Sequence, residues 1–304
     1  MGTPAFAVPS LRALASAAYE VVGVYTQPDR RAGRGRRVVP SPAKQASMEL
    51  GIGVYQPKSF REANAVDQLK ALKPEVIVVA AYGLILPRAV LEVPAYGTLN
   101  VHPSLLPRHR GASPVASAIL SGDEDTGVTI MLVEPRVDAG PVLSSTNISI
   151  GLDDTTGTLT EKLARVGADL LVETLPRWLR GEIEPEPQDD SKATYSKMIT
   201  KADGEIDWRM PAEEIGRRVR AFDPWPGTYT RWRGKLLKVL RGRPREADQA
   251  VEPGAVVPLS GAVAVATGEG ALVLDMLQLE GRKVMDAETF VRGHRGFVGS
   301  TLPS

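Results

Sequence analysis

Glu75–Ala81 (EVIVVAA) is a short, continuous run of apolar and mostly β-branched residues, and Val21–Tyr25 (VVGVY) is a second such run. Runs of this kind are typical of strands that are buried on both faces, as in a parallel sheet. Further strands are predicted at Thr98–Val101 and Val128–Val133, and helices at Pro9–Ala18, Ala63–Leu72 and Ser113–Ser121. This alternation predicts an open α/β fold, whose functional residues lie beyond the carboxyl ends of the strands.

The second half of the chain has a different pattern. Thr156–Arg180 carries leucines at helical spacing and predicts one long amphipathic helix, and the polar, proline-bearing stretch Glu182–Lys192 indicates a linker. After Gly204, β-prone segments recur at Thr228–Trp232, Leu236–Leu240, Ala255–Val257, Ala262–Ala266 and Ala271–Met276. Their spacing predicts a small antiparallel barrel. We therefore expect two domains, 1–181 and 204–304, joined by a linker over 182–203.

The start of the chain departs from this scheme. Met1 is followed at once by Gly2-Thr3-Pro4, which favours a turn, whereas an open α/β domain normally begins with a buried strand. We expect that the first strand is missing here or lies upstream of Met1.

Composition excludes several classes of function. The net charge of +1 means that any contact with nucleic acid must come from local patches. The absence of cysteine excludes disulfides, cysteine-ligated zinc, iron–sulfur clusters and a thiol nucleophile. No apolar run approaches the roughly 20 residues that span a bilayer, and the first residues do not have the pattern of a signal peptide. These features fit a cytoplasmic protein.

Three polar side chains form the candidate catalytic group. Asn100 and His102 are two apart at the end of a predicted strand, so their side chains lie on the same face. An amide that donates to an oxyanion therefore stands beside an imidazole that moves a proton, and Asp138 supplies a carboxylate to orient the imidazole. Taken singly, each residue is more often structural: Asn100 a loop cap, His102 a hydrogen-bonded residue after a strand, and Asp138 a turn acid. Their occurrence together favours acyl or formyl transfer, and no metal is required.

The flanking motifs resemble those of the methionyl-tRNA formyltransferase family, nearly from end to end. The resemblance is carried by Asn100–Gly111 (NVHPSLLPRHRG), Val137–Pro141 (VDAGP), Ala81–Pro87 (AYGLILP), Gly2–Pro9 (GTPAFAVP) and Ala221–Gly227 (AFDPWPG). It implies a Rossmann-like formyltransferase domain with a mostly parallel sheet, followed by an OB-like β-barrel that binds tRNA. It also implies 10-formyltetrahydrofolate as co-substrate, methionyl initiator tRNA as acceptor, no metal, and a monomer. One departure is His109, where the family often has a bulky aromatic residue.

The same resemblance implies the folate contacts. They are expected in two segments, namely Tyr82, Gly83, Leu84, Ile85 and Leu86, and then Ser104, Leu105, Leu106 and Pro107. His109 and His294 are interpreted as surface or packing residues.

Two basic runs are candidates for binding tRNA phosphates. The first, free of acids between Asp29 and Glu49, carries Arg30, Arg31, Arg34, Arg36, Arg37 and Lys44. The second carries Arg231, Arg233, Lys235 and Lys238, continues to Arg245, and is interleaved with Tyr229 and Trp232. Each run has a simpler interpretation, as a solvated loop or as the polar face of a hairpin. Together they suggest a tRNA held by both domains.

Several alternatives stay open from the residues alone. The same site could formylate glycinamide ribonucleotide or an amino-sugar nucleotide, or could pass the formyl group to water as a hydrolase. A nonenzymatic RNA-binding protein would keep both basic runs but not need the three polar residues. Gly33-Arg34-Gly35 lies in a charged loop, so it is not a dinucleotide-binding fingerprint.

Overall fold

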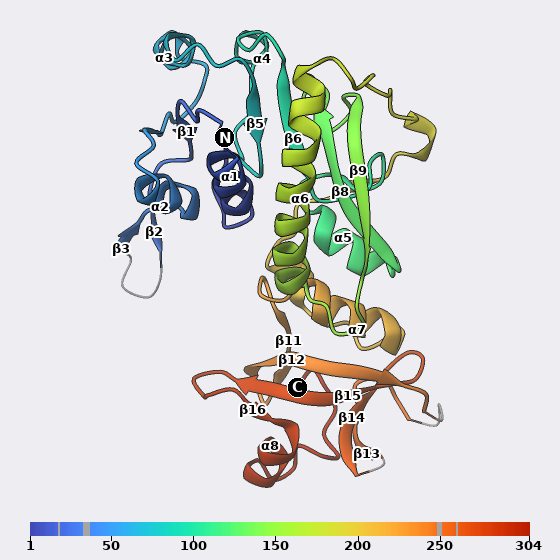
Figure 1. Cartoon of the computed structure of the whole chain (residues 1–304). Helices are drawn as coiled ribbons and strands as arrows, with labels where there is room; N and C mark the ends of the chain where they lie inside the picture. The colour runs from blue at the N-terminus through green and yellow to red at the C-terminus, as the bar shows by residue number, and fades with distance from the viewer. Residues whose placement is uncertain (18, 33–36, 248–250, 260) are drawn as a thin grey trace. The chain divides into compact units, whose positions relative to one another are not determined.

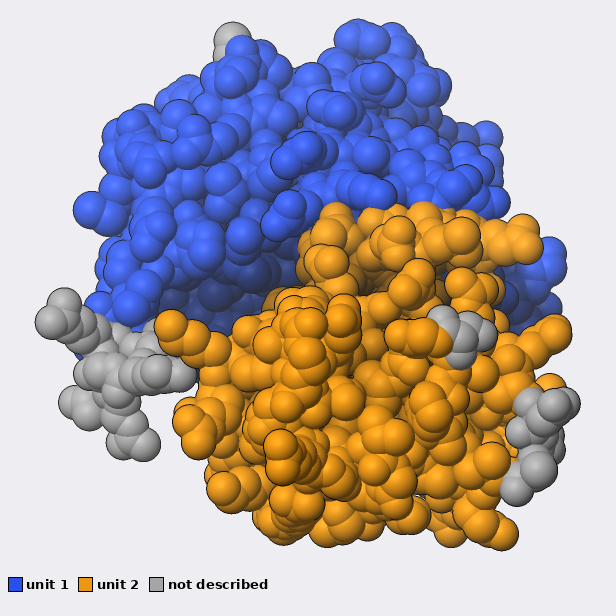
Figure 2. Space-filling view, turned by 90° about the horizontal axis from the view of Figure 1, so that it is seen from below, with its two compact units in different colours: residues 1–114, 125–149, 159–196 blue, residues 115–124, 150–158, 197–304 orange. Residues whose placement is uncertain are grey.

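The computed structural model describes residues 1–17, 19–32, 37–247, 251–259 and 261–304. The chain forms two compact units (Figure 2). The first comprises residues 1–114, 125–149 and 159–196, and the second comprises 115–124, 150–158 and 197–304. Each unit is described by itself.

The first unit is built around strands with helices beside them (Figure 1). Its strands are β1 (Val24–Tyr25), β2 (Arg30–Ala32), β3 (Arg37–Val39), β4 (Val54–Tyr55), β5 (Ile77–Val79), β6 (Thr98–His102), β7 (Arg110–Gly111), β8 (Asp125–Leu132), β9 (Val142–Ser149) and β10 (Tyr195–Ser196). The helices of this part of the chain are α1 (Ala7–Ser16), α2 (Pro42–Glu49), α3 (Ala63–Ala71), α4 (Arg88–Leu91), α5 (Pro114–Ser121) and α6 (Thr156–Leu179). A short 3-10 helix covers Asp190–Lys192.

The sheet of the first unit mixes both pairing modes. β1 pairs with β4 in parallel, and β5 pairs with β6 in parallel. β6, β8 and β9 then pair antiparallel, in the order β5-β6-β8-β9. Two of these parallel strands, β1 and β5, lie in the apolar runs that predicted them, whereas β4 was not predicted. The alternating burial of β9 reflects a strand with one solvated face.

Helix α6 packs on the strands that lead to the candidate site. Its buried residues include Leu159, Leu163 and Leu171, as the apolar periodicity predicted. At Gly167 a Cβ atom would lie 2.8 Å from a γ-carbon of Val101 in β6 and 3.2 Å from one of Val128 in β8. The helix therefore lies against these two strands at its closest approach, as Figure 1 also shows.

The first two residues take the place where a strand would begin. The Met1 ammonium donates to Val78 O at 2.6 Å, and Gly2 N donates to Tyr25 O at 2.9 Å. Gly2 also forms a parallel bridge with Ala80, so this short segment joins the β1 and β5 edges. Next to it lies a cavity of about 500 Å³, lined by residues 19–25 and 72–78 and, on α6, by Leu175 and Leu179.

The second unit is an antiparallel sheet with helices, and it also includes most of α5 and the first residues of α6. Its elements are the 3-10 turn Ala202–Gly204, α7 (Ala212–Ala221), β11 (Thr228–Trp232), β12 (Lys235–Arg245), β13 (Val256–Leu259), β14 (Ala262–Ala266), β15 (Ala271–Leu279), β16 (Met285–Asp286) and α8 (Ala287–Gly293). The strand order is β11-β12-β15-β14-β13, with β16 on β15, and every pairing is antiparallel. Antiparallel pairing was predicted, and two strands, β11 and β14, have the predicted bounds. Among the described residues, no ladder joins β13 to β11 to close a barrel.

The core of the second unit explains one difference from the sequence analysis. Trp232 was interpreted as an aromatic member of a basic run suited to nucleic acid, but it is only 4% exposed. It packs edge-on against Phe290 and Phe297, with ring centroids 5.9 and 5.3 Å away. Its place on the inward face of β11, together with Thr228 and Thr230, follows from the two-residue period of a strand. His294 stacks on Phe290 at 4.1 Å, which agrees with its interpretation as a packing residue.

Candidate active site

Strand β6 delivers Asn100 and His102 to one edge of the sheet. Val79 pairs with Asn100, so the loops that follow β5 and β6 leave the sheet at neighbouring points. The next strand, β8, holds the other side, with His102 opposite Thr129. Val101, between the two polar residues, points the other way and is 1% exposed. The alternation of the strand thus separates the polar face from the packed face.

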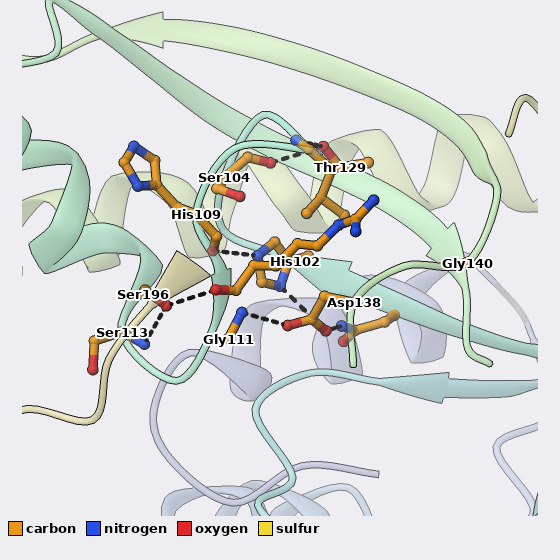
Figure 3. A network of polar contacts seen from close by, with 12 residues as sticks. His102, Ser104, His109, Gly111, Ser113, Thr129, Asp138, Gly140 and Ser196 are labelled. Atoms are coloured by element: carbon orange, nitrogen blue, oxygen red, sulfur yellow. Dashed lines mark hydrogen bonds and ion pairs between the residues drawn. The ribbon is translucent and has the colours of Figure 1, made fainter. Parts of the chain in front are cut away.

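Asp138 meets both side chains from a loop after β8, and Figure 3 shows it beside His102 and Gly111. Its Oδ1 lies 3.5 Å from Asn100 Nδ2, which donates to it, and 3.8 Å from His102 Nδ1. Its Oδ2 accepts a hydrogen bond of 2.8 Å from Gly111 N. The three residues predicted to act together are therefore brought together, with the carboxylate at their centre.

His102 is enclosed, and its environment sets its charge. Its side chain is 4% exposed, against 17% for that of Asp138. Burial lowers the pKa of His102 below the usual 6.5, and this outweighs the opposing effect of the nearby Asp138 carboxylate. The Nε2 atom lies 3.3 Å from His109 O, and a carbonyl oxygen only accepts, so this contact places the proton of the neutral ring on Nε2. The Nδ1 lone pair then faces Asp138.

The backbone of Asp138 is unusual. Its φ is +49°, in the left-handed region that most side chains avoid, and His109 has a φ of +57°. Such conformations persist only where the surrounding contacts hold them, and they concentrate at functional sites.

The loop after His102 is tied to β8. Thr129 Oγ1 donates to Ser104 O at 2.7 Å and accepts from Leu106 N at 3.1 Å. Ser104 Oγ donates in turn to Arg108 O at 2.7 Å. The segment from Ser104 to Pro107 therefore has a fixed shape beside His102, although only Ser104 of its four residues is fully buried.

The segment after β5 is held by hydrogen bonds at Tyr82 and is exposed to solvent at Ile85. Tyr82 is 2% exposed, and its carbonyl accepts hydrogen bonds from Thr3 Oγ1 and Gln27 Nε2. Leu84 and Leu86 are half-buried against the apolar cluster around Tyr82. Ile85 is 89% exposed, which is rare for so apolar a side chain.

Comparison with known proteins bears on this geometry. Residues 1–175 match the model of the formyl transferase family, and residues 198–295 match that of the formyl transferase C-terminal domain. A methionyl-tRNA formyltransferase of Chloroflexus aurantiacus (strain ATCC 29366 / DSM 635 / J-10-fl) is 51% identical over 295 residues, which cover 96% of this chain and 95% of the relative. The chain belongs to the methionyl-tRNA formyltransferase family. A second relative of that name, from Dehalococcoides mccartyi (strain ATCC BAA-2266 / KCTC 15142 / 195), is 49% identical over 99% of this chain and 97% of its own length.

Solved structures agree on the fold of this formyltransferase. WlaRD, a sugar 3N-formyl transferase crystallised with dTDP and 5-N-formyl-THF, superposes with a TM-score of 0.67 at 14% identity, over 93% of this chain and 97% of WlaRD. HypX from Aquifex aeolicus, in complex with tetrahydrofolic acid, gives a TM-score of 0.57 at 21% identity, over 77% of this chain and 42% of HypX. At these identities the likeness concerns the fold alone.

The first basic run of this formyltransferase lies on a hairpin of β2 and β3. Arg30 is exposed and donates to Gln27 Oε1. Arg34 and Arg36 lie outside the described residues, and of Arg31 and Arg37 only the backbone is described. Lys44 differs from the expectation of a mobile cation, because it pairs with Asp29 at 2.6 Å and donates to Gln56 Oε1 at 2.9 Å.

The second run is partly structural. Arg231 and Lys235 are exposed, and Lys238 is half-buried opposite Tyr229. Arg233 lies over the Trp232 ring at 4.6 Å and donates to Arg295 O. Part of the hydrogen-bonding capacity of its guanidinium is therefore used within the unit. An exposed basic edge remains, with Tyr229 as its aromatic member.

Sequence reasoning missed residues that support the site from a distance. Arg110 is fully buried, and Gln188 donates to Asp138 O and Gly140 O. Gln188 belongs to the stretch expected to be a linker, and its polar, proline-bearing composition gave no signal of these contacts. Within the described ranges, no group of His, Asp and Glu side chains could hold a metal ion. No helix of the described chain is long and apolar enough to cross a membrane.

Proposed function

We propose that this protein transfers the formyl group of 10-formyltetrahydrofolate to the α-amine of methionyl initiator tRNA, for translation initiation. The observation that carries the proposal is the contact of one carboxylate, Asp138, with both Asn100 and His102, at the sheet edge of a formyltransferase fold. The relatives named methionyl-tRNA formyltransferase, which match nearly the whole chain, support this acceptor over a small sugar nucleotide.

Each residue has a distinct task in this proposal. The α-amine attacks the formyl carbon, a C–N bond forms, and the carbonyl oxygen becomes an oxyanion. Asn100 Nδ2 carries a second hydrogen besides the one directed at Asp138, and this hydrogen donates to the oxyanion. The proton lost by the amine passes to the pair of Asp138 and His102, where Nδ1 holds a free lone pair. The bond from carbon to the folate nitrogen then breaks, and that nitrogen takes up the proton. Positioning supplies the remaining acceleration.

We propose that the folate lies between the two loops that leave β5 and β6. Exposed Ile85 lies between half-buried Leu84 and Leu86, and these apolar side chains offer a contact surface for an aromatic ring. The Ser104–Pro107 backbone, held by Thr129, offers polar groups of fixed position. These features fit a co-substrate with a flat ring and a polar rim.

We propose that the β2–β3 hairpin and the β11–β12 edge bind tRNA phosphates. Arg30, Arg31, Arg34, Arg36 and Arg37 serve the hairpin, and Arg231, Arg233, Lys235 and Lys238 the edge, whereas Lys44 acts mainly by holding Asp29. In this proposal the first unit binds the folate and carries the catalytic residues, and both units contact the tRNA, the second through the β11–β12 edge. We further propose a monomer that works in the cytoplasm, where initiator tRNA is used.

The test compares three formyl acceptors with a reaction in buffer alone, where water is the acceptor. The protein is incubated with 10-formyltetrahydrofolate and, separately, methionyl initiator tRNA, an amino-sugar nucleotide, glycinamide ribonucleotide or buffer alone. N-formylmethionine should appear with the tRNA. Formate release in buffer at the same rate would indicate a hydrolase, and faster formylation of a small acceptor would overturn the proposal.

The catalytic assignment has its own test. His102→Ala and Asp138→Ala should abolish formylation while tRNA binding stays near normal, and Asn100→Ala should slow the reaction by about 10²–10³. Full turnover by these variants would contradict the assignment.

The electrostatic assignment is tested by salt dependence. Neutralising Arg34, Arg36 and Arg37 together should weaken tRNA use and flatten its dependence on salt, by up to about 0.9 in log–log slope for each lost phosphate contact. An unchanged slope would remove the hairpin from the proposal.

A further inference from the structure

Residues 186–196 cross the candidate site and are bonded to both of its sides. On one side, Glu186 exchanges two backbone hydrogen bonds with Val142, of 2.8 and 2.9 Å. On the other side, β10 pairs with β7, and Arg110 N donates to Thr194 O at 2.9 Å. Ser196 Oγ donates to Arg110 O at 3.1 Å and accepts from Ser113 N at 3.0 Å (Figure 3). This segment therefore joins the loop that carries Asp138 to the loop that carries Gly111.

Gln188 makes this connection with a single side chain. Its Nε2 donates to Asp138 O at 3.0 Å and to Gly140 O at 2.7 Å. Its Oε1 accepts from Arg110 Nε at 3.0 Å and from Arg110 Nη2 at 2.8 Å. Both ends of the amide are used, so its orientation is fixed by its partners.

Arg110 gives Gln188 a rigid support. Its guanidinium is fully buried, and besides Gln188 it donates to Asp190 Oδ1 at 2.8 Å, with Tyr195 Oη at 3.5 Å. Asp190 also pairs with Arg136, which lies two residues before Asp138. A buried charge is tolerated only where such partners surround it, so this side chain is held in one position.

The backbone of Asp138 needs this support. Its left-handed φ of +49° is costly for any residue other than glycine. The hydrogen bond from Gly111 N holds the carboxylate of Asp138 but not its backbone. We infer that Gln188, held by Arg110, is a positioning residue that fixes the Asp138 main chain so that its carboxylate meets Asn100 and His102. This inference rests on the proposed role of Asp138 in formyl transfer.

The test compares two replacements of Gln188. Gln188→Glu keeps the acceptor for Arg110 but removes the donor to Asp138 O and Gly140 O, and Gln188→Met removes both. Both should lower kcat by about 10- to 100-fold, as expected for a shift of the catalytic group by about 1 Å, while KM for both substrates stays unchanged. In Gln188→Met, which adds no charge, the midpoint of the His102 titration followed by NMR should also move to lower pH, because a displaced carboxylate no longer favours the charged form of the ring. The charged or titratable groups that act on that ring are Asp138 and His109.

Controls separate this role from a structural one. Gln278→Met removes a comparable side-chain hydrogen bond, to Arg282 O, from β15 of the other unit without adding a charge, and it should behave as wild type. Wild-type kcat in both Gln188 variants and an unmoved His102 titration in Gln188→Met, with Asp138→Asn inactive, would overturn the inference. So would a loss of kcat that only follows the unfolded fraction in a thermal melt. Full activity of Asp138→Asn would instead overturn the role proposed for Asp138, and the inference with it.

Discussion

Replacing Gly167 by alanine tests how tightly helix α6 holds β6, the strand that carries Asn100 and His102. The added Cβ would lie 2.8 Å from a γ-carbon of Val101, which is 1% exposed and stands between Asn100 and His102. Carbon atoms prefer a separation of about 3.5–4.0 Å, so helix and strand must part by about 0.7–1.2 Å. Val101 is β-branched and cannot rotate away at low cost.

The magnitude follows from two opposing effects. Alanine in a helix interior gains up to about 1 kcal/mol over glycine, and overpacking of a dense core costs about 1–3 kcal/mol. The net loss of unfolding free energy is therefore about 0–2 kcal/mol. The effect on kcat should be larger, because a displacement near 1 Å of catalytic groups costs as much as about 10²-fold.

The assay pairs urea unfolding with formyl transfer under saturating substrates. Gly293→Ala is the matched control, because an added Cβ at this exposed helical position meets nothing within 4 Å. It should be neutral or stabilising and fully active. In the Val101→Ala background, Gly167→Ala should lose most of its effect, which a double-mutant cycle measures. Equal kcat for Gly167→Ala and Gly293→Ala, or an unchanged effect in the Val101→Ala background, would refute the reasoning.

Three further predictions concern single groups. Because burial lowers the pKa of His102, its imidazole should stay neutral at pH 6.5 and take up a proton only at lower pH; a midpoint above 6.5 in an NMR titration of the ring would contradict this. Burial also lowers the pKa of the Met1 ammonium from 8.0 to about 5, so the unfolded state binds the extra proton between these values. The free energy of unfolding should then fall as the pH drops from 8 toward 5, by at most about 1.4 kcal/mol per unit, and an apolar strand fused before Met1 should remove that slope in urea titrations. Thr129→Val leaves Ser104 O and Leu106 N without their partner, so steady-state kinetics should show a raised KM for the folate and an unchanged KM for the tRNA.

Local patterns were enough to predict the elements that carry the site. The apolar run at residues 75–81 contains β5, and the spacing of Asn100 and His102 places both on one face of β6. The antiparallel pairing of β8 and β9 was not predicted, because the direction of a strand depends on its connection rather than on its own composition.

The parts that could not be predicted depend on long-range contacts. Gln188 meets Asp138 across 50 residues of chain, and no periodic pattern marks such a pair. The orientation of Trp232 was open to prediction from the alternation in β11, but its basic neighbours suggested a surface role. Residues 182–196 contact the first unit despite a linker-like composition, so a fragment ending at residue 181 would lack Gln188 and β10.

The left-handed backbone at Asp138 restricts which residues evolution can place there. Aspartate and asparagine visit this conformation more readily than other non-glycine residues, whereas glutamate would add strain while moving its charge outward by one carbon. Substitution by glutamate keeps the charge, but it would both strain the backbone and displace the carboxylate from Asn100 and His102. The backbone conformation and the proposed chemistry therefore restrict this position to the same few residues. Extra stability elsewhere in the protein would not relax that restriction.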